Sequence, residues 1–128
     1  MAATRFDVLG IGNAIVDVIA RTDDAFLAKH QMRKGTMRLI DEAQAAGLYD
    51  AMGPAVEVSG GSAANTIVGA ASLGARAAFI GKVKDDELGR VFAHDIRAAG
   101  VAFATPPASA GPSTARCYVL SRPTASAP

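Results

Sequence analysis

Short apolar runs alternate with amphipathic stretches along the chain, and glycines separate many of them. The runs at residues 6–12 and 13–20 are rich in β-branched residues and predict two consecutive strands. Further strands are predicted at residues 35–40, 56–59, 75–83, 101–103 and 116–120. Helices are predicted over residues 24–30, 42–51, 62–73 and 87–99. Strands that alternate with helices of this size predict an α/β fold with an at least partly parallel sheet.

Local signals define several helix ends. Asp41 and Gln44 have capping-box spacing, so the second helix is expected to begin after Asp41. Asp85 or Asp86 is expected to cap the fourth helix, which carries an amphipathic stripe of Leu88, Val91, Phe92, Ile96 and Ala99. The third helix is small and apolar on almost every side, which predicts burial all round, and Gly74 is a natural stop for it.

Composition narrows the function classes. The 128 residues include 13 Lys+Arg and 12 Asp+Glu, so the formal net charge is +1, which argues against nucleic acid and membrane surfaces as partners. Cys117 is the single cysteine and cannot form an internal disulfide. The N-terminal MAATRFD lacks the apolar segment of a signal peptide, and scattered His and Cys residues give no metal-ligand spacing. We therefore expect a cytoplasmic protein without a metal site of its own.

Two polar residues interrupt the first apolar layer. Asn13 and Asp17 could hold hydroxyl groups, because a carboxylate accepts two hydrogen bonds and an amide both donates and accepts. An Asx turn at Asn13 and a salt-bridged Asp17 would explain the same residues equally well. The nearby Gly10-Ile11-Gly12 invites a dinucleotide-binding interpretation, but Ile15 takes the place of the third glycine and a strand follows where that motif needs a helix.

The segment Gly60-Gly61-Ser62-Ala63-Ala64-Asn65 is more informative. Paired glycines at a strand-to-helix junction expose backbone N–H groups at the positive end of a helix dipole, where polar ligand atoms can approach. Asn65 then lies in the first helical turn, where it would serve a ligand or cap backbone groups of an ordinary glycine-rich turn.

The stretch VSGGSAANTIVGAASLGARAAFIGKVKDDELG resembles the N-terminal signature of the ribokinase/PfkB family of carbohydrate kinases. Its matching residues are, in order, Gly60, Gly61, Asn65, Gly74, Gly81, Asp86 and Gly89. The upstream GIGNAIVDVIA, KGTMRLID and EAQAAGLYDAMG resemble the adenosine-kinase-like branch. One departure is Lys84, which stands where the family often has glycine.

The resemblance implies an incomplete ribokinase-like three-layer α/β/α core, with residues 1–120 as the N-terminal part of a kinase domain. Segments 14–40 and 112–120 would supply part of a small β-sheet lid. By position, the substrate-binding residues would be Asn13, Asp17, Met37, Gly60, Gly61 and Asn65, with Met37 on a lid strand.

The resemblance also implies an activity. Such proteins transfer phosphate from ATP, with Mg²⁺, to a hydroxyl of a small-molecule sugar or nucleoside, here one that is adenosine- or ribose-like. The family's catalytic Asp lies in a Gly-Ala-Gly-Asp stretch, which this sequence does not contain, so catalytic, ATP-binding and Mg²⁺-binding residues are assigned to none of its positions. We expect negligible kinase activity from the chain as it stands. The alternative is a non-catalytic fragment that binds sugars or pairs through a strand edge, including in a homodimer.

The last eight residues, Ser121–Pro128, predict an irregular tail. They can be back-translated so that another reading frame encodes T-P-D-G-Q-R-T, which resembles the turn that usually follows in the family. One hypothesis is therefore a base lost near codon 121 that shifted the reading frame.

Overall fold

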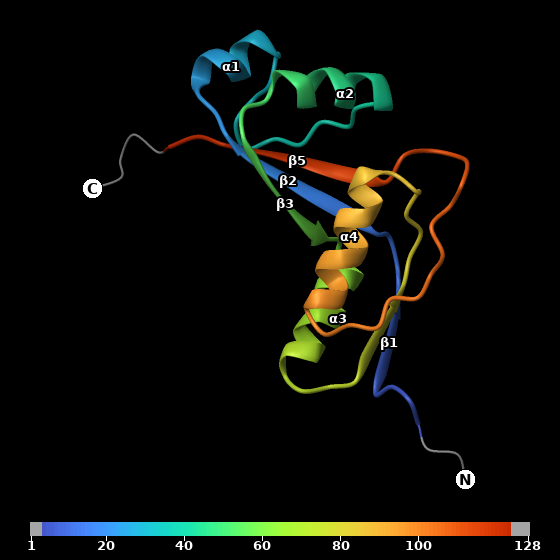
Figure 1. The fold of residues 1–128 in the computed structure, drawn as a ribbon. Coiled ribbons are helices and arrows are strands. Elements are labelled where there is room, and N and C mark those ends of the chain that lie inside the picture. The colour runs from blue at the N-terminus through green and yellow to red at the C-terminus, as the bar shows by residue number, and fades with distance from the viewer. Residues whose placement is uncertain (1–3, 124–128) are drawn as a thin grey trace. The chain divides into compact units, whose positions relative to one another are not determined.

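The structure, a computed structural model, describes residues 4–123. The chain divides into two compact units, of which the first holds the residues up to Asp17 together with Glu57–Cys117, and the second holds Val18–Val56 and the residues from Tyr118 onward. Figure 1 labels the elements in chain order: β1 (Val8–Ile11), β2 (Ile15–Arg21), α1 (Asp24–Lys29), α2 (Glu42–Ala51), β3 (Ala55–Gly60), α3 (Ser62–Ser72), β4 (Ala77–Ile80), α4 (Glu87–Ala98) and β5 (Ala115–Ser121). No helix among residues 4–123 is long and apolar enough to cross a bilayer.

A parallel sheet forms the centre of the first unit. β1 and β4 pair in parallel with Gly10 opposite Phe79 and Ile11 opposite Ile80. On the other side of β4, Ala102 forms a parallel bridge with Ala78, in the segment predicted as a strand at residues 101–103. The predicted α/β class with parallel pairing is therefore confirmed, although β4 is shorter than the predicted strand over residues 75–83.

The helices α3 and α4 pack on the same face of this sheet. Phe79 of β4 contacts the ring of Phe92 on α4, with ring centroids 5.9 Å apart, and Phe103 completes the cluster at 6.1 and 5.4 Å from them. All three rings are buried. Aromatic rings at these separations add to the burial of their apolar area, so the cluster is the packing centre of the unit.

Close packing of α3 explains the glycines that suggested a dinucleotide site. A Cβ on Gly10 would meet Ile67 of α3, with its Cδ1 atom only 2.8 Å away, and a Cβ on Gly12 would lie 2.6 Å from the Cβ of Ala63. The chain continues from Gly12 into β2 rather than into a helix. These glycines therefore let helix and strand approach, which is a packing role.

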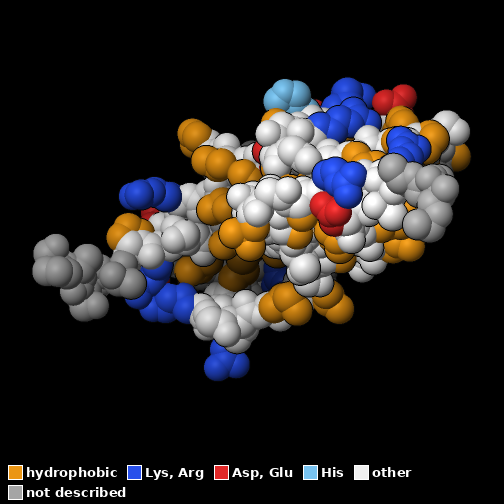
Figure 2. Space-filling view, turned by 90° about the horizontal axis from the view of Figure 1, so that it is seen from below, with side chains coloured by type: hydrophobic (Ala, Val, Ile, Leu, Met, Phe, Trp, Pro, Cys, Tyr) orange, Lys and Arg blue, Asp and Glu red, His pale blue; other side chains and the backbone are white. Residues whose placement is uncertain are grey.

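The opposite face of the β1–β4 sheet is open. Leu9, Ile11 and Ile80 alternate with the inward-facing residues, and Ile11 is 71% exposed. The space-filling view shows hydrophobic side chains at the surface, with Lys and Arg in several separate places (Figure 2). An α/β sheet covered on one face only fits a partial three-layer core.

A second sheet has the strand order β3-β2-β5, which Figure 1 shows with β2 in the middle. Along β2, Val16, Val18 and Ala20 are buried and alternate with more exposed residues, as expected for a strand covered on one face. The predicted strands at residues 13–20, 56–59 and 116–120 are confirmed within two residues at each end.

In the second unit, α1 and α2 form where the sequence predicts them. Asp41 accepts a hydrogen bond from the Gln44 N–H at 2.7 Å, and the Gln44 side chain accepts one from the Asp41 N–H at 3.0 Å, so the predicted capping box is present. The Tyr118 hydroxyl donates to the carbonyl of Ala45 at 3.0 Å, which attaches β5 to α2.

Two expectations were wrong. Residues 35–40 form no strand, so Met37 does not lie on a lid strand; instead, the Arg38 guanidinium donates to the carbonyls of His30 and Gln31 at 3.4 and 3.3 Å and holds the segment against the end of α1. The helix α3 is not buried all round, because Asn65, Thr66 and Ser72 are exposed and only Ala64 and Ile67 are fully buried.

We predict that Phe92→Leu lowers the free energy of unfolding by about 1–2 kcal/mol, because it removes ring contacts from the aromatic cluster. Urea unfolding followed by circular dichroism measures the change. The matched control is Leu73→Ala, at a position that is 89% exposed, which should change the value by less than about 0.5 kcal/mol. Equal effects of the two substitutions would contradict the assignment of the packing centre.

Candidate functional site

The carboxylate of Asp17 lies directly against the backbone of Gly60. A Cβ built on Gly60 would lie 2.7 Å from the Asp17 Cγ, so only glycine leaves room for the carboxylate there. Asp17 is half-buried on β2 and forms no ion pair among the residues that the structure describes, so the salt-bridged alternative is wrong. A half-buried carboxylate without a cationic partner can accept hydrogen bonds from a ligand.

The next residue, Gly61, contacts the turn that follows β1. Its φ of +100° suits glycine, and a Cβ there would lie 2.7 Å from the backbone oxygen of Asn13. Gly61 is also the N-cap of α3, and no side chain caps this helix. The first-turn N–H groups therefore lack a side-chain acceptor and can face a ligand.

Asn65 follows one helical turn later. Its backbone N–H donates to the Gly61 carbonyl at 2.8 Å, while its side chain is exposed and forms no hydrogen bond among residues 4–123. Asn65 therefore does not cap the glycine-rich turn, which removes the structural alternative. The contacts join Asn13, Gly61, Gly60 and Asp17 in one continuous arc, with Asn65 attached through the helix backbone.

Met37 is the one predicted substrate-binding residue that lies outside the first unit. It belongs to the second unit, lies in a segment without regular structure and is 86% exposed.

A cavity of about 330 Å³ lies beside Asn13. It is lined by the turn after β1, the loop after β4 and the segment before β5, namely Gly12, Asn13, Ala14, Ile15, Lys82, Lys84, Pro112, Ser113, Thr114 and Ala115. Of the residues predicted as substrate-binding, Asn13 alone lines it. Because its walls come from three segments far apart in sequence, no local motif could have predicted it.

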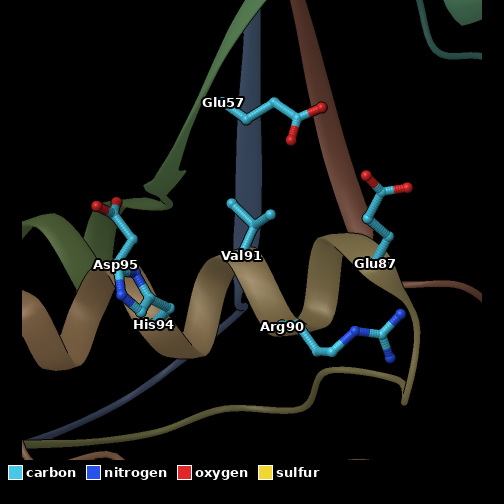
Figure 3. Close-up of a pocket in the computed structure, with 6 residues that line it drawn as sticks. All are labelled: Glu57, Glu87, Arg90, Val91, His94 and Asp95. Carbon is cyan, nitrogen blue, oxygen red and sulfur yellow. The ribbon is translucent and has the colours of Figure 1, made fainter.

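A hollow of about 370 Å³ lies between β3 and α4, lined by Glu57, Glu87, Arg90, Val91, His94 and Asp95. Figure 3 shows Glu57 coming from β3 and the others from α4, with Arg90 projecting away. Two of these charges already have structural roles: Asp95 accepts from the Ser59 N–H, and Arg90 pairs with Asp85 at 3.2 Å. Among the described residues, no group of three His, Cys, Asp or Glu side chains could hold a metal ion.

Near the cavity beside Asn13, the carboxylate of Asp86 accepts three hydrogen bonds. It accepts from the Thr114 hydroxyl at 2.7 Å, the Thr114 N–H at 2.9 Å and the Gly89 N–H at 2.8 Å, the last of which caps α4. Burial alone would raise its pKa, but these hydrogen bonds and the charge of Arg116 outweigh it, so the pKa of Asp86 is lowered from its usual value of 3.8. Asp86 and Gly89, which both match the sequence signature, therefore have a structural role here: together they begin α4, and Asp86 holds Thr114.

Comparison with known proteins places this geometry in a family. The sequence profile of the pfkB family carbohydrate kinases matches residues 7–126. Among curated proteins, Fructokinase-1 of Oryza sativa subsp. japonica is 42% identical over 78 residues, which are 60% of this chain and 24% of that protein. The 5-dehydro-2-deoxygluconokinase of Shouchella clausii (strain KSM-K16) is 32% identical over 97 residues, which are 76% of this chain and 23% of that protein. The chain thus spans about a quarter of the length of these relatives.

Solved structures give a similar result. Adenosine kinase from Sinorhizobium meliloti matches with a TM-score of 0.79 and 57% identity, over 93% of this chain and 36% of that one. A probable sugar kinase protein from Rhizobium etli CFN 42 matches with a TM-score of 0.79 and 53% identity, over 94% of this chain and 36% of that one. The fold is therefore a partial ribokinase-like fold that covers about a third of these full-length structures.

We predict that Asp86→Asn lowers the free energy of unfolding by about 1–2 kcal/mol at neutral pH, because the amide cannot accept all three hydrogen bonds. Since the folded-state pKa is lowered, the stabilisation by the carboxylate is complete above the ordinary pKa of 3.8 and is lost as the pH falls through the folded-state value. Urea unfolding at a series of pH values should show the difference from wild type shrinking below about pH 4.

The control is Asp50→Asn, since Asp50 is exposed at the end of α2. Its difference from wild type should stay small at every pH. A pH-independent loss for Asp86→Asn would contradict the role assigned to the charged carboxylate.

Proposed function

Because the chain belongs to the PfkB family of carbohydrate kinases, we propose that it carries the sugar-holding part of an ATP-dependent kinase that acts on an adenosine- or ribose-like substrate. The observation that carries the proposal is the continuous arc of Asn13, Gly61, Gly60 and Asp17. The adenosine and sugar kinases among the similar structures support the substrate class.

The arc has the chemistry that a polyhydroxylated ligand needs. Asp17 is a carboxylate that accepts hydrogen bonds from adjacent hydroxyls, and the uncapped N-terminus of α3 offers N–H donors to hydroxyl oxygens. Asn65 adds an exposed amide that both donates and accepts. Glycine at positions 60 and 61 keeps the backbone accessible, since a Cβ at either position would occupy the space beside these groups.

The family generally uses ATP with Mg²⁺, and when bound these supply the transferred phosphoryl group and neutralise its charge. The 128-residue sequence has no Gly-Ala-Gly-Asp, the stretch that carries the family's catalytic Asp, so no residue of this chain is assigned the role of the base. The contribution proposed for this chain is therefore to bind and orient the hydroxylated substrate, without deprotonating it.

We predict that Gly60→Ala weakens adenosine or ribose binding by about tenfold, because the added methyl group displaces the Asp17 carboxylate. Isothermal titration calorimetry with the 128-residue chain measures the dissociation constants. The matched control is Gly69→Ala in α3, where a Cβ meets nothing within 4 Å, and binding should be unchanged. Equal dissociation constants for the Gly60 and Gly69 variants would overturn the proposed site.

A second prediction concerns turnover. The 128-residue chain with ATP, Mg²⁺ and adenosine or ribose should produce no ADP above the background in a coupled assay, although it binds the substrate. ADP formation that is lost in Asp17→Asn would show that the chain is catalytic by itself and would contradict the division of roles proposed here. If the chain binds neither adenosine nor ribose, the proposed function is ruled out.

A further inference from the structure

The cavity beside Asn13 lies where ligands commonly bind in parallel sheets. The Gly12 N–H donates to the Ile80 carbonyl at 3.1 Å, so β1 and β4 end side by side, and the chain leaves them through Asn13 and Lys82. Both residues line the cavity. Open α/β sheets bind ligands outside the carboxyl ends of their strands, which is the position of this cavity.

Two lysines give the cavity its charge. Lys82 is exposed and Lys84 is half-buried, and both line the same space of about 330 Å³. Neither forms an ion pair with a carboxylate among residues 4–123. Of the neighbouring acids, Asp85 pairs with Arg90, and Asp86 accepts from Gly89 and from Thr114, which itself lines the cavity. Of the described residues, two lysines and no acidic residue line this cavity, a balance of charge that attracts an anion.

The walls of the cavity are fixed to each other by hydrogen bonds. The Lys84 N–H donates to the Thr114 hydroxyl oxygen at 3.0 Å, and the Asp85 N–H donates to the Ala108 carbonyl at 2.9 Å. Thr114 is buried and is itself held by Asp86. The loop after β4 and the segment before β5 therefore keep the two lysine backbones in place, and binding an anion requires only side-chain ordering.

From this arrangement we propose that the cavity is an anion subsite in which Lys82 and Lys84 hold a phosphate group of a small ligand beside Asn13. The proposal deepens the proposed function and rests on it for the placement of the sugar at Asn13. The phosphate can come from a phosphorylated sugar, whose hydroxyls face the Asp17 arc, or from the polyphosphate of a nucleotide. Lysine ammonium groups bind phosphate as point charges, which suits either source.

The test compares three ligands on the 128-residue chain by NMR titration at low salt: ribose, ribose 5-phosphate and inorganic tripolyphosphate. Backbone amide signals of Asn13, Lys82, Lys84 and Thr114 should shift with the anionic ligands. Ribose 5-phosphate should bind about tenfold more tightly than ribose, and the gain should fall as salt is raised. In Lys82→Gln/Lys84→Gln the gain should vanish, whereas ribose affinity should stay within about twofold of wild type.

The charge-matched control is Lys29→Gln/Lys34→Gln, which removes two exposed lysines of the second unit and should preserve the gain. If tripolyphosphate binds more tightly than ribose 5-phosphate, and Lys82→Gln/Lys84→Gln abolishes that binding, the result supports the subsite. It then assigns the subsite to the polyphosphate of a nucleotide. If neither ribose 5-phosphate nor tripolyphosphate binds wild type more tightly than ribose does, or if the tighter binding is equal in the two double variants, the proposal is overturned. Anion binding without ribose binding would leave the subsite standing and remove the proposed function instead.

Discussion

The close approach of backbone and side chains around the start of α3 is the constraint on which the rest of the first unit depends. The absence of a Cβ at Gly10 and Gly12 lets α3 lie against β1, and the same absence at Gly60 and Gly61 lets Asp17 and the Asn13 carbonyl approach the helix N-terminus. Steric room, rather than a strong interaction, therefore assembles the candidate site. A side chain at Gly10 would push α3 away from β1, and one at Gly60 would displace the Asp17 carboxylate. Either change would separate the groups that would face a ligand.

Asp86 supplies a second organising contact, now electrostatic. One carboxylate caps α4 through Gly89 and holds Thr114, which in turn accepts from Lys84, so a helix and two loops meet at a single charged group. The same residue that begins a helix thereby shapes the wall of the cavity beside Asn13. Stability and the shape of this cavity share the contact, and both are expected to respond to the protonation of Asp86.

Much of the fold could be predicted from the sequence because its signals are local. The capping box of Asp41 and Gln44, the cap at Asp86 and the glycine stop at Gly74 each act within a few residues. Residues 35–40 were predicted wrongly because loose alternation suggests a strand, whereas Arg38 binds carbonyls at the end of α1. The small side chains of α3 did not reveal which side of the helix is exposed. The cavity beside Asn13 could not be predicted because one of its walls includes Thr114, thirty positions from Lys84 in the chain.

The open face of the β1–β4 sheet has a consequence for the chain in a cell. Leu9, Ile11 and Ile80 present aliphatic side chains on a parallel sheet that has helices on its other side. Chaperones that bind unfolded or half-assembled proteins select surfaces of this kind, and proteases act on chains that are held in that state. The lifetime of the chain would then be set by how fast that face is covered, independently of how well the candidate site is formed.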